Sequence, residues 1–242
     1  MEWFESLKSD FINCFITKNR WTMLTKGLGN TLLITVIALA IGMVIGILIA
    51  VIRVAWDANS TRMKKGPMRF LLHAADCICR VYTTVIRGTP SVVQLMIMYY
   101  IILASSRNAI LVAAISFGLN SGAYVSEIVR GGILSIDKGQ TEAGRSLGLN
   151  YVQTMFYIIA PQVLKNILPT MCNEFITLIK ETSVAGWVGV PELTYGGDRI
   201  RGTTYSAFMP LIAVALIYLG VVMILTKLTG MLERRLRKGD RR

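Results

Sequence analysis

The chain has 242 residues, of which 53% are hydrophobic and 17% are charged, and its mean hydropathy is +0.54. Soluble domains carry about 25% charged residues, so this composition favours a membrane protein. The net charge is +12, and such a basic excess usually indicates nucleic acid or an anionic membrane surface as partner. Because the basic residues lie between long uncharged runs and at the C-terminus, we expect a lipid bilayer and no nucleic acid.

Residues 1–27 contain several lysines and no long apolar run, which argues against a cleavable signal sequence. Within this segment, large apolar residues recur at helical spacing: Trp3, Leu7, Phe11 and Phe15. That spacing predicts an amphipathic helix that lies on the outer membrane interface. We therefore expect residues 1–27 to form an N-terminal interfacial segment.

Four uncharged runs are long enough to cross the hydrocarbon core of a bilayer, which takes about 20 helical residues. They are Leu28–Ile52, Gly88–Ser106, Asn108–Ser126 and Gly202–Thr226. Arg107 alone separates the second run from the third, which predicts a tight helical hairpin. In the first run, Gly42 and Gly46 form a pair of small residues that lets another helix approach closely.

A fifth span is predicted over Thr154–Glu181, where an apolar segment also contains prolines and charged residues. In chain order it is span four, and Gly202–Thr226 is span five. Prolines and charged residues are tolerated at membrane depth where neighbouring helices or a water-filled cavity surround them. We therefore expect this span to face the protein interior. Residues 28–228 then form an all-α polytopic membrane domain with about five transmembrane helices.

The basic segments predict the orientation of the chain. The loop Arg53–Arg69 and the tail 229–242 are rich in lysine and arginine, which places both in the cytoplasm. With five spans, the N-terminus is then outside, and the segment between spans three and four is cytoplasmic. The expected location is the inner or plasma membrane of a cell.

The sequence lacks the motifs of common enzyme sites: there is no GxxxxGK[ST], HExxH or GxSxG, and the only histidine is His73. The four cysteines have no zinc-type spacing and are read as packing thiols. We therefore expect no enzyme activity, no metal and no cofactor bound by this chain. The remaining classes are a transporter subunit, a channel or a membrane scaffold.

A short polar helix is predicted after span three. Asp137 is an N-cap residue with Gln140 three positions later, which is close to a capping box. Gly148 is suited to the left-handed conformation that ends a helix. The small residues Ala143 and Gly144 are expected on the surface of this helix, where they let a partner approach.

A second helix follows the first after a sharp elbow. Asn150 and Gln153 repeat the capping pattern, so this helix begins at Tyr151 and meets Pro161, our predicted start of span four. The mixed character of residues 137–161 is typical of a segment that contacts a protein at one end and membrane at the other.

This segment resembles the EAA loop of ATP-binding-cassette (ABC) importer permeases, in which Glu-Ala-Ala is followed by Gly, Ile and Leu-Pro at fixed spacings. The matching residues are Glu142, Ala143, Gly148, Ile158 and Pro161, whereas Gly144 and Ala160 depart from the pattern. The nine-residue gap between Gly148 and Ile158 makes a chance match improbable.

Further segments are similar to the polar amino acid branch of that family, which includes histidine and glutamine permeases. They are Arg87–Pro90, Val93–Leu95, Ala123–Gly132, Lys138–Gln140, Asn173–Phe175, Lys180–Ser183 and Gly189–Leu193. The resemblance implies a type I importer fold that pairs as a homo- or heterodimer. It also implies two ABC ATPase subunits, which hold ATP and magnesium, and an extracellular or periplasmic amino acid-binding protein.

The resemblance assigns the EAA loop as a coupling helix that seats in a groove of the ATPase. The residues expected at this contact are Gln140, Glu142, Ala143, Gly144, Arg145 and Gly148. The alternative interpretation is a solvated loop with ordinary surface charges, in which Gly148 serves only as a helix cap.

Candidate cavity residues lie in span four. Glu174, Thr177 and Glu181 share one helical face, and Asn173 precedes them. A carboxylate inside the membrane is by default a functional hypothesis, here as an acceptor for an α-ammonium group or a cationic side chain. The alternative is internal pairing of these carboxylates, for example of Glu174 with a basic residue on another span.

Three further residues are candidates for contact with a substrate carboxylate. Thr182 and Ser183 offer hydroxyls or backbone amides, and Arg87 precedes a Gly-Thr-Pro sequence at the start of span two. An anchoring role at the membrane edge explains Arg87 equally well. Glu127 and Arg130 are expected to form an ion pair at helical spacing.

The sequence therefore predicts the permease subunit of an amino acid importer that works by alternating access, driven by ATP hydrolysis on a separate subunit. Three alternatives stay open: a permease for another small polar solute such as an opine or cystine, a non-transporting scaffold or sensor that keeps the ATPase dock, and a channel. A channel needs no ATPase dock, so the elbow argues against it.

Overall fold

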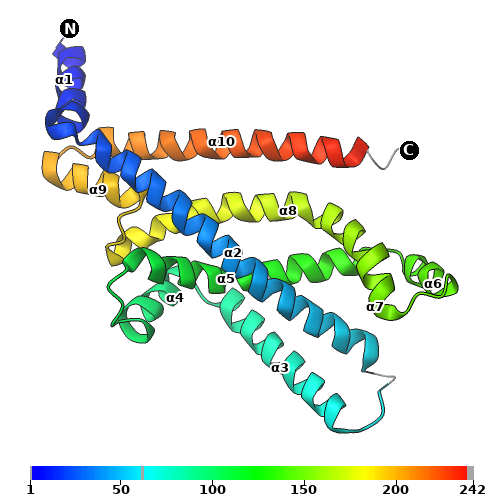
Figure 1. Cartoon of the computed structure of the whole chain (residues 1–242). Coiled ribbons are helices and arrows are strands. Elements are labelled where there is room, and N and C mark those ends of the chain that lie inside the picture. The colour runs from blue at the N-terminus through cyan, green and yellow to red at the C-terminus, as the bar shows by residue number, and fades with distance from the viewer. Residues whose placement is uncertain (1, 61–62, 239–242) are drawn as a thin grey trace. The chain divides into compact units, whose positions relative to one another are not determined.

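A computed structural model describes residues 2–60 and 63–238 of the chain, and all regular structure in these residues is helical (Figure 1). The α-helices are α1 Glu2–Phe11, α2 Trp21–Asn59, α3 Pro67–Gly88, α4 Ser91–Ile97, α5 Ala109–Leu134, α6 Lys138–Ser146, α7 Tyr151–Thr154, α8 Ala160–Glu181, α9 Leu193–Thr204 and α10 Phe208–Lys238. Shorter π and 3-10 segments are η1 Ile12–Ile16, η2 Thr17–Asn19, η3 Met98–Ile102, η4 Met155–Ile159 and η5 Thr182–Val188.

The chain divides into two compact units. The first unit comprises Met1–Leu39, Pro90–Gly118 and Phe175–Lys227, and the second comprises Ala40–Thr89, Leu119–Glu174 and Leu228–Arg242. The second unit contains the predicted elbow, and all the contacts of the elbow given below lie within it.

Apolar side chains from several helices form the core of each unit. The first unit has one cluster around Phe117 and Leu178 and another around Leu193 and Ile200. The second unit is built on a cluster formed by α2, α5, η4 and α8: Ala50, Val125, Val129, Ile159, Val163 and Ile167. Because lipid tails are as apolar as these side chains, close van der Waals packing rather than removal from water holds such helices together in a bilayer.

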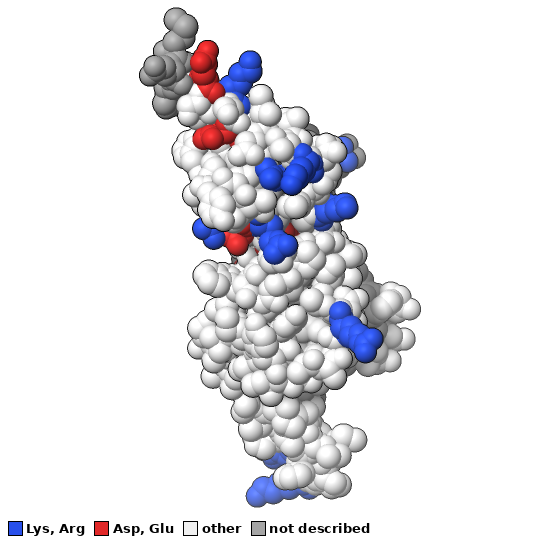
Figure 2. Space-filling view, turned by 90° about the vertical axis from the view of Figure 1, so that its left-hand side faces the viewer, with Lys and Arg blue, Asp and Glu red and all other residues white. Residues whose placement is uncertain are grey.

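Three of the described helices are long and apolar enough to cross a membrane: α2, α5 and residues Phe208–Leu236 of α10. A fourth candidate arises if α3 and α4 with η3 are counted as one broken span. The predicted number of five spans stays a prediction, because α8 carries too many polar residues to count by this measure. Figure 2 shows a face of the molecule on which charged side chains are sparse and separated by uncharged surface.

The glycine pair of α2 packs against α5, as predicted. A Cβ on Gly42 would lie 3.0 Å from the Ser121 Cβ, and a Cβ on Gly46 would lie 2.6 Å from Val125 Cγ1. Because neither glycine carries a side chain, the two backbones approach closely. This contact fixes the register of α2 against α5 in the second unit.

Span two differs from the prediction of one continuous helix over Gly88–Ser106. Helix α3 ends at Gly88, Thr89 is extended, and the helix resumes at Ser91 and ends at Ile102. The cause is Pro90, because a residue that precedes proline is driven out of the helical region. The sequence prediction also missed α3, because it placed residues 67–69 in the basic loop and assigned residues 70–87 to no element.

The last span begins later than predicted. Residues Gly202–Thr204 belong to the end of α9, and α10 starts at Phe208. Tyr205 takes a left-handed conformation with φ of 55°, which ends α9. The predicted basic tail continues α10 as far as Lys238, and residues 239–242 lie outside the described residues.

The N-terminal segment is helical, but the prediction of one amphipathic stripe is wrong after Phe11. Positive φ angles at Lys18 and Asn19 turn the chain back, and Phe15 is buried in the core of the first unit beside Cys14. Phe11 stays exposed, and its ring packs edge-on against the ring of Phe15, with the two ring centres 5.1 Å apart. The predicted role of the Trp3 side chain lies outside what the structure describes.

Candidate functional site

Helix α6 begins as predicted, with an N-cap at Asp137. The Asp137 carboxylate accepts a hydrogen bond of 2.6 Å from the backbone amide of Gly139. Gln140 does not complete the box; its side-chain oxygen accepts a hydrogen bond of 3.2 Å from Gln162 Nε2 of α8. The first turn of α6 is thereby linked to the start of α8.

The elbow is closed by backbone hydrogen bonds around Gly148. This residue has φ of +82°, the left-handed conformation that its sequence position predicted. The amide of Leu149 donates to the carbonyl of Gly144 at 3.1 Å, and the amide of Gly148 donates to Arg145 at 3.0 Å. These two bonds form the Schellman arrangement that ends a helix. Any other residue at 148 would be strained in this conformation.

The second helix of the elbow starts with a complete capping box. The side chain of Asn150 accepts from the amide of Gln153, and the Gln153 side chain accepts from the amide of Asn150, both at 2.9 Å. The helix then passes through the π turn η4 before α8 begins at Ala160. Pro161 lies in the first turn of α8, close to the predicted start of span four.

Gly144 is buried inside the elbow, so the prediction that it lies on the surface is wrong. A Cβ at this position would lie 2.7 Å from Thr154 Cγ2 and 2.9 Å from Ile158 Cδ1. The small residue therefore lets α6 pack on α7 and η4 of its own chain. This packing explains why the sequence has glycine here, where the resembling family has alanine.

The opposite face of α6 is exposed. Glu142, Ala143 and Arg145 are all exposed, and Leu147 at the elbow is 80% exposed. Val152 on α7 is likewise 72% exposed. A surface with charged residues beside bare aliphatic side chains is typical of a contact with another protein. No described contact within the chain uses the side-chain oxygens of Glu142.

Glu174 has a partner from another helix, but that partner is not basic. Its carboxylate accepts a hydrogen bond of 2.8 Å from Ser121 Oγ of α5, within the second unit. The side chain stays partly exposed, and its neighbour Asn173 is exposed. The alternative, in which Glu174 pairs with a basic residue on another span, therefore has no support among the described contacts, and Glu174 remains a candidate.

The other candidates lie in different surroundings. Thr177 is exposed and Glu181 is half-buried. The hydroxyl of Thr182 is buried and donates to the carbonyl of Ile179 at 2.7 Å, and Ser183 donates to Lys180 at 2.6 Å. Both hydroxyl hydrogens are thus committed to their own chain, which argues against the predicted use of these hydroxyls as donors.

Arg87 is exposed at the end of α3, with its guanidinium 5.4 Å from the ring centre of Tyr124. A cation over an aromatic face is held in position by the ring's electron density. The arginine is therefore oriented within the second unit, which is compatible with either an anchoring or a binding role.

Glu192 lies in one of the segments that resemble the family, and sequence reasoning did not identify it as a functional residue. The structure shows that its carboxylate is buried. It accepts hydrogen bonds from the amides of Thr194 at 2.7 Å and Tyr195 at 2.6 Å, and from Tyr218 Oη at 3.1 Å. Burial raises its pKa, whereas these hydrogen bonds lower it, and the net direction is upward. Glutamate directly before a helix was the available signal for this cap.

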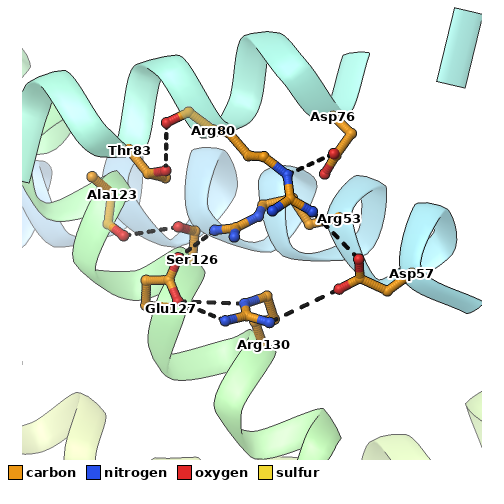
Figure 3. A network of polar contacts seen from close by, with 9 residues as sticks. All are labelled: Arg53, Asp57, Asp76, Arg80, Thr83, Ala123, Ser126, Glu127 and Arg130. Atoms are coloured by element: carbon orange, nitrogen blue, oxygen red, sulfur yellow. Dashed lines mark hydrogen bonds and ion pairs between the residues drawn. The ribbon is translucent and has the colours of Figure 1, made fainter. Parts of the chain in front are cut away.

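The predicted ion pair on α5 is present and belongs to a larger group. Arg130 Nε lies 3.4 Å from Glu127 Oε2, and Glu127 is also paired with Arg53 of α2. Figure 3 shows this group, which includes residues of α3 that the sequence prediction did not connect.

The fold and the elbow define the class of an all-helical membrane protein with an exposed, capped loop between α5 and α8. Residues 72–238 match the family model for the binding-protein-dependent transport system inner membrane component, and the chain belongs to this family. The predictions of family and of an all-α permease fold are thereby confirmed. The family comprises transport components, so the prediction that the chain is not an enzyme is also confirmed.

Named relatives match nearly the whole chain. The arginine transport system permease protein ArtQ of Bacillus subtilis is 37% identical over 89% of this chain and 93% of its own length. The glutamine transport system permease protein GlnP of Escherichia coli has the same identity and coverage.

Solved structures are similar as well. A crystal structure of an amino acid ABC transporter with histidines has a TM-score of 0.78 and 35% identity, covering 91% of this chain and 98% of that chain. An inward-facing methionine transporter, MetNI, has a TM-score of 0.73 at 20% identity, covering 89% and 97%. This second likeness concerns the fold alone.

Proposed function

We propose that this chain is the membrane-spanning permease subunit of an ABC importer for a polar amino acid. ATP is hydrolysed on separate ATPase subunits, and the site in the membrane opens alternately to either side. The names of the relatives support a polar amino acid as cargo, since they are permeases for arginine and glutamine. The chain itself then binds no ATP or magnesium.

The proposed assembly contains two permease copies, identical or different, two ATPase subunits and an external amino acid-binding protein. The family description supports this by naming a binding-protein-dependent system. We propose that the N-terminus is outside and the C-terminus is in the cytoplasm. The basic loop 53–69 and the basic tail 229–242 support this orientation.

The exposed elbow is the single observation that carries this proposal. Helix α6 is held on one face by Gly144 and ended by Gly148, whereas Glu142 and Arg145 point away from the chain. A rigid element with a free polar face is suited to receive force from the ATPase and pass it to α5 and α8. Gly144 and Gly148 act here by shaping the elbow, and Glu142, Ala143 and Arg145 form the contact.

Reconstitution tests the proposed transport. The chain is assembled in liposomes with its cognate ATPase and binding protein, and uptake of labelled arginine, glutamine and histidine is followed with ATP inside. We expect ATP-dependent uptake of at least one of them. No uptake of any amino acid, with intact ATP hydrolysis, would leave the scaffold or sensor alternative; uptake of an opine or cystine alone would change the cargo.

A charge reversal tests the coupling contact. Glu142→Lys should weaken association with the ATPase and lower uptake at least tenfold, an effect of about 1.4 kcal/mol or more, because it inverts charge on the exposed face. Glu5→Lys provides the control, since it makes the same change on exposed α1. If Glu142→Lys transports like this control, Glu142 has no role in docking.

The proposed substrate contact is Glu174, whose carboxylate takes the α-ammonium group or a cationic side chain. Its partial exposure and its single hydroxyl partner support this role. Glu174→Gln keeps the shape and removes the charge, so we expect a raised KM for uptake with less change in maximal rate. Thr177→Ala and Arg87→Gln test two other exposed candidates in the same assay. Unchanged uptake and substrate preference in Glu174→Gln would exclude it.

A further inference from the structure

Six charged side chains form a nearly closed ring in the second unit (Figure 3). Each of three helices contributes two residues: Arg53 and Asp57 from α2, Asp76 and Arg80 from α3, and Glu127 and Arg130 from α5. Three arginines face three carboxylates, so the formal charge of the group is zero. A balanced group of this kind is what a chain in a bilayer needs in order to bury charge.

Successive members of the ring carry opposite charges and are paired. From Asp57 in one direction, the Asp57 Oδ1 atom lies 3.4 Å from Arg80 Nη2. Arg80 Nε lies in turn 2.7 Å from Asp76 Oδ2. In the other direction, Asp57 Oδ2 lies 3.9 Å from Arg130 Nη1.

Arg130 Nε in turn lies 3.4 Å from Glu127 Oε2, and Glu127 Oε1 accepts from Arg53 Nη1. The ring lacks only a contact between Arg53 and Asp76.

Each residue at this gap has one buried polar atom that is not used. Within the described part of the chain, Arg53 Nε and Asp76 Oδ1 have no hydrogen-bond partner, and their side chains are 9% and 3% exposed. One is a donor and the other an acceptor, of opposite charge. A buried polar atom without a partner costs free energy, and these two atoms would satisfy each other if Arg53 and Asp76 came into contact.

We infer that Arg53 is a two-position switch, which pairs with Glu127 in the conformation seen here and with Asp76 in the alternate conformation of the transport cycle. Asp76 keeps Arg80 on its other oxygen in both states. The outer members of the ring are half-exposed, so their pairs contribute little. Arg53 is therefore a positioning residue, and the inference rests on the proposed function.

The position of the switch gives it a role in coupling. Glu127 and Arg130 lie on the last two turns of α5, and α5 leads through Ser135 and Ile136 into the cap of α6. A shift of α6 is thus carried along α5 to Glu127. When α5 moves Glu127 away from Arg53, Asp76 on α3 offers the arginine a second partner. The exchange of partners thus links movement of the elbow to the relative positions of α2, α3 and α5.

Two neutral, isosteric variants distinguish a switch from a structural clamp. Glu127→Gln removes the partner of one state and Asp76→Asn removes the partner of the other, so they shift the equilibrium in opposite directions. Each loss of a charged hydrogen bond corresponds to about tenfold. We measure ATP hydrolysis without amino acid, and amino acid uptake, by the full complex of permease, ATPase and binding protein in liposomes.

The expected result is that one variant raises substrate-free ATP hydrolysis and the other lowers it, while both reduce the amino acid transported per ATP. Asp198→Asn is the control, because it breaks an exposed ion pair with Arg201 in the first unit. Changes in the same direction would overturn the switch, since a structural clamp or a fixed bridging water loses function in both variants. Rates equal to the control would overturn it as well.

Further variants keep the test decisive if a neutral one does not assemble with the ATPase. Glu127→Asp and Asp76→Glu retain charge and alter reach, and they should again move the hydrolysis rate in opposite directions. Arg53→Lys keeps the positive charge but lacks the planar guanidinium fork, so it pairs more weakly with either carboxylate. This variant should fold and should transport less amino acid per ATP. If the wild-type complex transports and the variants have the same hydrolysis and uptake rates as Asp198→Asn, the switch is refuted and the proposed function stands. If the wild-type complex does not transport, the proposed function and the switch are refuted together.

Discussion

Substitution of Gly46 by alanine should force α2 away from α5. The added Cβ would lie 2.6 Å from Val125 Cγ1, 2.7 Å from Val125 Cβ and 2.9 Å from the backbone nitrogen of Ser126. These atoms belong to a β-branched side chain and a backbone, and neither can swing aside. Ordinary contact requires about 3.5–4.0 Å, so the helices must separate by about 1 Å.

The size of the effect follows from two opposing terms. Overpacking costs about 1–3 kcal/mol, with the upper end expected here because backbone atoms are involved. Alanine gains about 1 kcal/mol over glycine in a helix interior. The net loss for Gly46→Ala is therefore about 1–2 kcal/mol. In a domain of this size, 1 kcal/mol shifts the melting temperature by about 2–4 °C.

A matched glycine on the same helix provides the control. Gly29 also lies within α2, but a Cβ there would meet nothing within 4 Å. Gly29→Ala should therefore melt at or above the wild-type temperature, and Gly46→Ala below it, when both are unfolded thermally in the same detergent. If the two variants melt together, close packing at Gly46 does not stabilise the second unit, and the steric reasoning fails.

Two further predictions concern caps. Asn150→Ala removes the capping box at the elbow, so we expect a loss of about 1 kcal/mol and faster hydrogen exchange at Tyr151–Thr154; unchanged exchange would contradict it. Glu192→Gln tests the buried cap of α9, whose raised pKa means that the unfolded chain releases this proton at lower pH than the folded chain. Its contribution to stability is therefore fully present below the ordinary carboxyl pKa and is lost as the pH rises from there through the raised pKa of the folded chain. The glutamine variant should show a flatter melting profile across that interval.

Features set by a few neighbouring residues were predictable from the sequence. The N-cap at Asp137, the left-handed Gly148 and the capping box of Asn150 and Gln153 all depend on contacts within one or two turns. Local sequence therefore determines where the two helices of the elbow end and begin. The glycine pair of α2 was also predictable, because small residues at this spacing have few uses in an apolar helix other than close packing.

Features set by distant parts of the chain were not predictable in this way. Helix α3 was missed because residues 70–87 contain charged residues and were assigned to no span, whereas Arg80 of this helix pairs with Asp57 of α2. The spacing of four between Asp76 and Arg80 was the signal for a helix, but it does not identify the partner helix. The burial of Glu192 was likewise not predictable from nearby sequence, since it involves packing against α2. A Cβ on Gly27 of α2 would lie 2.7 Å from the Glu192 carbonyl oxygen.

The two faces of α6 depend on different interactions, and this separation makes its function testable. The inner face is set by the absence of a side chain at Gly144, whose neighbours Thr154 and Ile158 leave no room for one. The outer face, with Glu142 and Arg145, makes no contact that the fold needs. Changes on the outer face should therefore leave the melting temperature unaltered while they abolish coupling, whereas Gly144→Leu should lower both. A loss of coupling without a loss of stability is the result that a docking surface predicts and a structural loop does not.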